Sequence, residues 1–281
     1  MKTLSLIFAL LVCVLFSLKA QEKVIAEVHY QFKHNNDTTK GAVQLTDETV
    51  TYLGKESSLY RTYSDILVKQ QLDAKTTAQD FDGNLTLKMP ASPPVLDGYI
   101  IYPSLKKTIH IAGISSPADA YSCEAPYESQ DWEITDETKT IGGYLCQKAT
   151  CRFKGRDYTA WFTTELPFSF GPWKLHGLPG LILSVQDSKN DVSWEYAGFQ
   201  KQPSNQSLRI EPAKSVIPAK KEEIQRLKTA FKENPSAYYE TLGATGRANP
   251  FQIDYSKVQI SFDVQGQAPS TQTNNPIELA P

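Results

Sequence analysis

The sequence predicts a mainly β protein: a strongly curved antiparallel sheet, shaped like half of a barrel, with C-terminal helices and a helix packed against it. Aromatic residues make up 11% of the chain and include 14 tyrosines, a composition that favours strands. Apolar and polar side chains alternate over residues 24–33, which is the period of a half-buried strand. The clearest helical spacing of apolar residues comes later, after Pro218.

Residues 1–20 have the pattern of a signal peptide. Lys2 gives a positive start, an apolar run follows to Phe16, and Ala20 offers a small residue before a cut at Gln21. The run is too short for a comfortable membrane span. We therefore expect an exported protein, periplasmic or secreted, with no transmembrane anchor after cleavage. An uncleaved N-terminal anchor is the alternative.

Charge narrows the class of partner. Cleavage removes two lysines, so the net charge of −2 becomes −4. A mildly acidic chain without basic blocks argues against nucleic acid or an anionic membrane as the main partner. We expect a single β-rich domain over residues 21–262, followed by a flexible tail over 263–281 that is rich in Gln, Thr, Ser and Pro.

The first half reads as strands with one helix among them. Val24, Tyr30 and Phe32 are expected on the buried side of the first strand. The other strands are expected at 42–45, 50–53, 58–63, 85–89, 98–102 and 107–112, and the helix at 65–74.

The central third predicts a long strand from Ile141 to Phe153, a hairpin turn at 154–156 and a return strand to Thr164. Leu145, Ala149, Cys151 and Phe153 are expected to point inward on the long strand. The return strand has Tyr158, Ala160 and Phe162 on one face and Trp161 on the other, which predicts cover on both sides of the sheet.

The run Gly177-Leu178-Pro179-Gly180-Leu181-Ile182, which we call the signature, reads as a tight turn that leads into a buried strand over 181–185. Proline presets φ at the second turn position, and we expect a positive φ at Gly180, as a type II turn requires. A helix follows Pro218, and Asn234-Pro235 ends it and begins a shorter one. None of the signature residues is a nucleophile, acid, base or metal ligand.

Catalytic and metal-binding motifs are not found, so no cofactor or metal is expected. The four histidines are scattered, and His176, beside the signature, is the best candidate acid or base. Its sequence position places no carboxylate beside it.

Three cysteines remain after cleavage. Cys146 and Cys151 are expected on one strand, ~16 Å apart, which excludes a bridge between them. Any internal bridge therefore includes Cys123, and three free thiols are the alternative.

The ordered series of motifs is similar to the GLPGLI family of exported bacterial proteins. The resemblance rests on Ile141-Gly142-Gly143-Tyr144-Leu145-Cys146, Lys148-Ala149-Thr150, Gly155-Arg156, Ala160-Trp161-Phe162, Gly171-Pro172-Trp173-Lys174, the signature, and Asn275-Pro276-Ile277-Glu278-Leu279. It implies export but no established activity and no catalytic residues. Because Cys146 falls on a family cysteine position, the resemblance favours a Cys123–Cys151 bridge with Cys146 free.

Three functions remain open. The first is a periplasmic or secreted binding or carrier module for an apolar ligand. Its candidate surface comes from the loop 165–176 and the adjacent strand: Trp161, Phe168, Phe170, Trp173 and His176. The second is a hydrolase that uses His176 with a carboxylate. The third is an outer-membrane-associated interaction module that docks through a sheet edge. In the simplest alternative, the aromatic loop is ordinary core.

Overall fold

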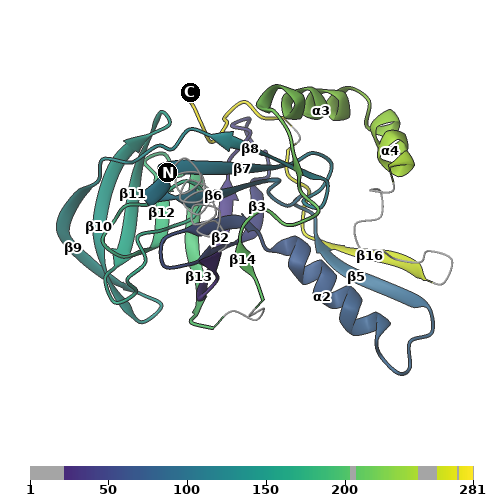
Figure 1. Ribbon diagram of the computed structural model, residues 1–281, viewed down its shortest axis with the longest axis horizontal. Helices are drawn as coiled ribbons and strands as arrows, with labels where there is room; N and C mark the ends of the chain where they lie inside the picture. The colour runs from purple at the N-terminus through teal and green to yellow at the C-terminus, as the bar shows by residue number, and fades with distance from the viewer. Residues whose placement is uncertain (1–21, 203–206, 246–257, 271, 281) are drawn as a thin grey trace, which may run out of the picture.

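The computed structural model describes residues 22–202, 207–245, 258–270 and 272–280, so the predicted signal peptide lies outside the described residues. The protein is mainly β, with helices in its C-terminal part (Figure 1). Twelve strands form one curved sheet in the order β15-β8-β7-β6-β4-β3-β2-β13-β12-β11-β10-β9. All neighbours in it are antiparallel except β15 and β8, and the sheet does not close. The predicted fold class is confirmed.

The sheet is built in two runs that meet in its middle, where β2 pairs with β13. Its strands are β2 (Ala26–His34), β3 (Leu45–Leu53), β4 (Ser58–Thr62), β6 (Asp97–Tyr102), β7 (Lys107–Gly113), β8 (Ala120–Ala125), β9 (Glu133–Ile141), β10 (Tyr144–Phe153), β11 (Arg156–Thr163), β12 (Leu181–Asp187), β13 (Val192–Gln200) and β15 (Ile217–Pro218). Strands far apart in sequence thus lie side by side.

Smaller elements flank this sheet. They are α2 (Ser64–Thr76), the 3-10 turn η2 (Pro103–Leu105), α3 (Lys221–Glu233), α4 (Pro235–Ala244), and the pairs β1 (Glu22–Lys23) with β14 (Arg209–Ile210) and β5 (Asn84–Pro90) with β16 (Gln259–Gln265). Helix α2 packs on β5 (Figure 1). Helices α3 and α4 bury Ile224, Tyr238 and Leu242 against Ala112, near the end of β7. All three helices lie close to their predicted positions.

The central strand prediction needs one correction. The chain reverses at Gly142 and Gly143, whose φ values are +58° and +88°, so β9 and β10 form a hairpin. Glycine supplies this left-handed backbone at no steric cost. The predicted long strand therefore begins at Tyr144, and Leu145, expected to point inward, is 60% exposed near its start.

The predicted flexible tail also differs from the structure. Its first residues complete β16, which pairs in parallel with β5 over residues 259–265. Residues 272–280 are tied to the loop after β2, to the β10–β11 turn and to the start of β11 by hydrogen bonds to Asn36, Lys154 and Arg156. A polar, proline-containing composition indicated disorder, but buried partners from distant strands hold this segment.

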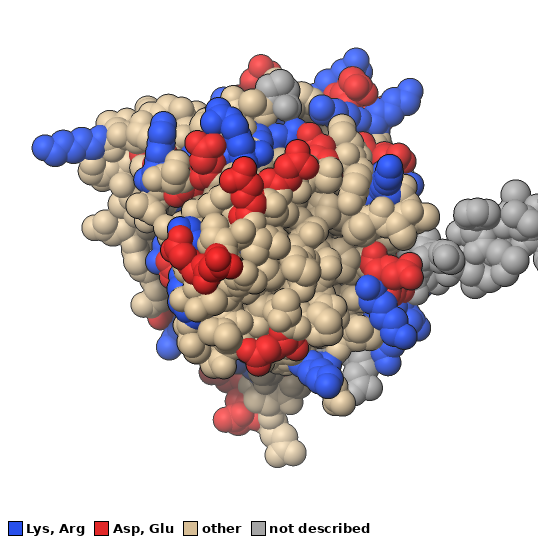
Figure 2. All heavy atoms as spheres, turned by 90° about the vertical axis from the view of Figure 1, so that its left-hand side faces the viewer, with Lys and Arg blue, Asp and Glu red and all other residues tan. Residues whose placement is uncertain are grey.

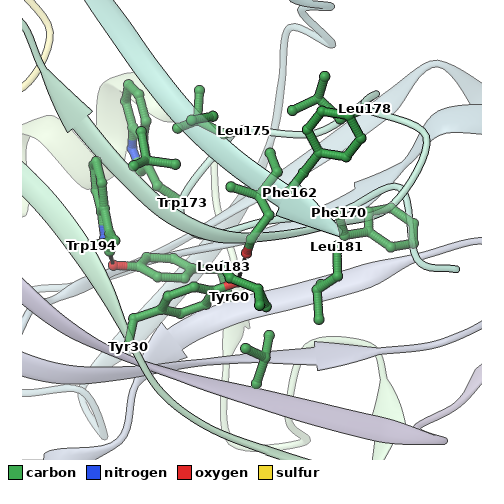
Figure 3. Close-up of a cluster of buried hydrophobic side chains, with 14 of the residues drawn as sticks. Tyr30, Tyr60, Phe162, Phe170, Trp173, Leu175, Leu178, Leu181, Leu183 and Trp194 are labelled. Atoms are coloured by element: carbon green, nitrogen blue, oxygen red, sulfur yellow. Dashed lines mark hydrogen bonds between the residues drawn. The ribbon is translucent and has the colours of Figure 1, made fainter. Parts of the chain in front are cut away.

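The main core lies between the two runs of the sheet and is filled by the loop between β11 and β12. Figure 3 shows Trp173 and Trp194 together on one side of this cluster, next to the rings of Tyr30 and Tyr60. Their polar atoms are satisfied: Trp194 Nε1 donates to Tyr60 Oη at 3.0 Å, and Tyr30 Oη donates to the carbonyl of Ile182 at 2.6 Å. Burial of hydrogen-bonded rings gives this core both stability and a fixed geometry.

The free edge of the sheet, β9, is polar and exposed. Glu133, Asp136, Glu137 and Lys139 lie along it, and charges on an edge strand oppose pairing with another chain. Figure 2 shows this side of the molecule, where acidic and basic side chains are interspersed around an uncharged area and neither sign dominates.

Candidate functional site

The aromatic loop 165–176 folds inward. Phe170, Trp173 and His176 are each buried, whereas Phe168 and Trp161 are partly exposed. Trp161 lies elsewhere, on β11, with the ammonium of Lys139 4.2 Å from its ring centroid. The structure therefore separates the predicted ligand surface: Trp173 joins a central aromatic group, and Trp161 does not.

Trp173 is held in an unusual position by its neighbours. Its φ is +57°, a left-handed conformation that is uncommon for a bulky residue. The indole stacks on Trp194 with ring centroids 5.8 Å apart and planes 12° from parallel, and it meets the edge of Phe153 at 5.6 Å. Packing on several sides thus fixes this ring, whose backbone conformation is costly by itself.

A cavity of about 360 Å³ opens beside this stack. Its aromatic walls are Phe32, Tyr60, Tyr99, Trp173 and Trp194; its other lining residues are His34, Asn36, Leu45, Val95, Asp97, Thr273, Pro276, Ile277 and Glu278. We call this cavity the aromatic pocket. Ligand sites in proteins are concave, mostly apolar and carry a few placed polar groups, and this cavity has all three properties.

Acidic groups mark the polar side of the aromatic pocket. Burial would raise the pKa of Asp97, but hydrogen bonds and charge from His110 and Lys228, each 2.9 Å away, outweigh it and lower this pKa to about 2. Glu278 pairs with Lys174 at 2.6 Å. The pocket therefore presents carboxylates, and Asp97 stays ionised at neutral pH.

His176 is held by the fold and has no carboxylate partner among the described residues. Its Nδ1 donates to the carbonyl of Lys174 at 2.9 Å, and its Nε2 accepts from the hydroxyl of Tyr127 at 3.0 Å. Burial lowers the pKa of His176, which keeps the ring neutral. With both nitrogens engaged and no carboxylate in contact in the described part of the chain, this geometry gives the hydrolase hypothesis no support.

The signature is structural, but not in the predicted way. Leu178, Leu181 and Ile182 are fully buried, and the positive φ belongs to Gly177, at +94°, not to Gly180. Gly180 is needed because a Cβ there would lie 2.1 Å from the carbonyl oxygen of Thr163. The predicted turn conformation is therefore wrong. Glycine is required at position 180 because two backbone segments approach closely there, and not because φ is positive. Pro179, between Gly177 and Gly180 in sequence, is exposed.

The predicted Cys123–Cys151 bridge is absent, because Cys123, Cys146 and Cys151 are all free thiols. Cys123 lies on β8 and Cys151 on β10, near opposite edges of the twelve-stranded sheet. Two residues so placed are beyond the reach of a disulfide.

Two further features lie outside the predicted site. A buried ion cluster joins His29 to Glu48 at 3.2 Å and to Glu27 at 3.5 Å. A second cavity, of about 590 Å³, lies between α2 and residues 207–216 and is lined by mixed polar and apolar groups.

In the described ranges no set of three or more His, Cys, Asp or Glu side chains is arranged to hold a metal ion. Nor is any helix in those ranges long and apolar enough to cross a membrane.

The sequence pointed to two walls of the aromatic pocket, Phe32 and Trp173, and missed the other three. Phe32 was expected to be buried, but Tyr60, Tyr99 and Trp194 come from three further strands. Trp194 alternates with polar neighbours on β13, but β4 and β6 are buried along nearly their whole length, so alternation does not single out Tyr60 or Tyr99. Only the pairing order of the strands brings them to one place.

Comparison with known proteins gives distant similarity. Residues 96–197 match the family described as N-glycanase peptide, N-terminal domain, a range that runs from β6 into β13 and includes the signature. Solved structures of PNGF-II in the C2 and P21 space groups are similar at 14% and 13% identity, with TM-scores of 0.47 and 0.46. They cover 75% and 73% of this chain, which spans 33% of theirs. No curated protein matches the chain.

Proposed function

We propose that this chain is an exported binding module of GLPGLI type that holds a small apolar ligand in the aromatic pocket. The observation that most supports this proposal is that five Phe, Tyr and Trp side chains line one cavity of about 360 Å³. Export rests on the signal-like pattern of residues 1–20. The similarity of residues 96–197 to a domain of an N-glycanase supports a module function, without indicating which ligand is bound.

The size and rigidity of the pocket favour a small ligand. Ligand cavities typically measure about 300–1,000 Å³, so this one lies at the small end of the range. Its walls are fixed by stacking of Trp173 on Trp194 and by the Trp194–Tyr60 hydrogen bond. A preformed wall loses little conformational freedom on binding, which leaves more of the burial energy for affinity.

The polar side of the pocket selects the ligand's head group. Asp97, which is ionised, and Glu278, which pairs with Lys174, line the cavity, and burial lowers the pKa of His34, so that its imidazole is neutral. Lys228 and Lys174 pair with these carboxylates but do not line the cavity, so an anionic head would lie nearer to the carboxylates and meet repulsion, whereas a neutral or cationic head would not. We therefore infer a ligand with a short apolar body and an uncharged or amine end.

Isothermal titration calorimetry with three matched eight-carbon probes tests this proposal. Octylamine and octanol are expected to bind, and octanoate is expected to bind at least about tenfold more weakly, a difference of ~1.4 kcal/mol. Leu45 lies at the pocket, so Leu45→Trp should fill the cavity and abolish binding. The matched control is Leu145→Trp, the same substitution at an exposed position of β10. Absence of binding by all three probes to the unmodified protein would refute the proposal.

The docking hypothesis has less support from the structure. The free edge strand β9 is charged and exposed along its length, a pattern that prevents edge pairing more often than it invites it.

A further inference from the structure

Residues 272–280, which we call the closing segment, form one wall of the aromatic pocket. Four of its residues, Thr273, Pro276, Ile277 and Glu278, line the cavity. The contacts that hold this segment come from β2, from the loop after it and from the β10–β11 turn, all more than 100 residues away in sequence. Its backbone is therefore bound as a ligand would be, by a surface made elsewhere in the chain.

Arg156 is the centre of that surface. Its guanidinium is 1% exposed and donates Nε to the carbonyl of Ile277 at 2.9 Å and Nη2 to the carbonyl of Pro276 at 2.7 Å. Nη1 donates to a carboxylate oxygen of Asp187 at 2.7 Å, and this bond fixes the orientation of the guanidinium. A planar guanidinium that donates to the carbonyls of two successive residues is suited to bind an extended backbone, because its N–H groups are fixed in one plane.

Asn275 is recognised through every polar group that it has. Its side chain accepts from Arg156 Nη2 at 2.7 Å and donates to the carbonyl of Asn35 at 2.8 Å. Its backbone N–H donates to the carbonyl of Asn36 at 3.1 Å, and its carbonyl accepts from Nε2 of the neutral His34 at 2.7 Å. Such a site discriminates against other residues, because they would leave buried polar groups unpaired.

The rest of the segment is placed by apolar contact, charge and a glycine. Pro276 and Ile277 lie at the aromatic pocket, where rigid proline-containing segments find aromatic walls. Glu278 pairs with Lys174, and the N–H of Leu279 donates to the carbonyl of Lys154 at 2.9 Å. A Cβ at Gly155, whose φ is +79°, would lie 2.9 Å from Leu279.

Simple packing does not require this chemistry. Replacing a buried Arg–carboxylate pair with apolar residues of the same volume is often neutral or stabilising, so stability alone is a weak reason for such a pair. The surface therefore carries more polar discrimination than is needed to hold a segment in place.

We propose that the groove formed by Arg156, His34 and the carbonyls of Asn35 and Asn36 is a peptide-recognition site for an extended segment containing Asn-Pro, which the closing segment fills in cis. This site adjoins the aromatic pocket but does not depend on the ligand proposed for it. Displacement of the closing segment by another peptide of this chemistry exchanges that wall of the aromatic pocket for the peptide.

The test uses a fluorescent synthetic peptide with the sequence of residues 272–281 and the full chain carrying Asn275→Ala, Pro276→Gly and Ile277→Gly. Fluorescence anisotropy should show the peptide binding to this variant, and at least about tenfold more weakly to the unmodified chain, whose groove is occupied. The same peptide with Asn275→Ala should lose about tenfold or more in affinity, whereas a Gln272→Ala peptide, changed at an exposed position, should not.

A measurement on the unmodified chain covers the case in which the variant does not fold. Excess peptide should speed hydrogen exchange of the backbone amides of Asn275 and Leu279, because it displaces the segment that protects them. The proposal is overturned if a folded variant does not bind the peptide, if the Asn275→Ala peptide binds equally well, or if excess peptide leaves both amides equally protected.

Discussion

Gly180→Ala tests the geometry at the signature. The added Cβ would lie 2.1 Å from the carbonyl oxygen of Thr163 and 2.6 Å from its carbonyl carbon. These are backbone atoms at the end of β11, so no side-chain rotation relieves the contact. Overpacking typically costs about 1–3 kcal/mol and can cost more, and we expect a loss near ~3 kcal/mol in the free energy of unfolding.

Gly177→Ala is the matched control. Nothing lies within 4 Å of a Cβ at Gly177, but its φ of +94° is unfavourable for alanine. Only backbone strain contributes, so we expect a smaller loss of about 1–2 kcal/mol. Urea unfolding of both variants, followed by tryptophan fluorescence and analysed with equal m-values, measures the difference. A Gly180→Ala variant as stable as Gly177→Ala, or more so, would refute the close-approach argument.

Three further predictions concern the core, the ion cluster and export. Trp173→Ala should lower the free energy of unfolding by about 3–5 kcal/mol in urea, because it empties the stack with Trp194; a loss below ~1 kcal/mol would contradict a core role. Burial would lower the pKa of His29, but Glu27 and Glu48 raise it from 6.5 to about 9. Protonated His29 therefore adds up to about 3 kcal/mol to the free energy of unfolding, which is fully present below pH 6.5 and is lost as the pH rises through 9. Unfolding measured at several pH values should show this decline in stability, and His29→Gln should abolish it. An equal decline in that variant would exclude His29 as the cause. Mass spectrometry of protein exported by a suitable bacterial host should find a chain that begins near Gln21; retention of Met1 would contradict the cleavage prediction.

Local patterns predicted local structure well. Alternation over residues 24–33 located β2 and its inward face, and apolar spacing after Pro218 located α3. The hairpin was missed because the strand prediction absorbed Gly142-Gly143, a pair that permits a turn but also occurs within strands. Gly180 shows the same limit, since a glycine needed for close approach cannot be distinguished from one needed for positive φ.

Nonlocal features could not be reached from the sequence. The aromatic pocket requires β2, β4, β6 and β13 to meet, and nothing in the sequence pairs the early β2 with the late β13. The polar composition of residues 263–281 likewise suggested disorder. The sequence does not show that the partners of Asn275 are supplied by strands more than 100 residues away.

The central claim is that the aromatic pocket binds a small apolar ligand, and the indole N–H signals of the four tryptophans test it most directly. In two-dimensional ¹H–¹⁵N NMR, octanol or octylamine should shift the signals of Trp173 and Trp194, which line the pocket. The signals of Trp132, whose Nε1 donates to the carbonyl of His176, and of Trp161, which lies beneath Lys139, should stay in place. Shifts confined to Trp161, or no shift at any indole up to millimolar probe, would contradict the account.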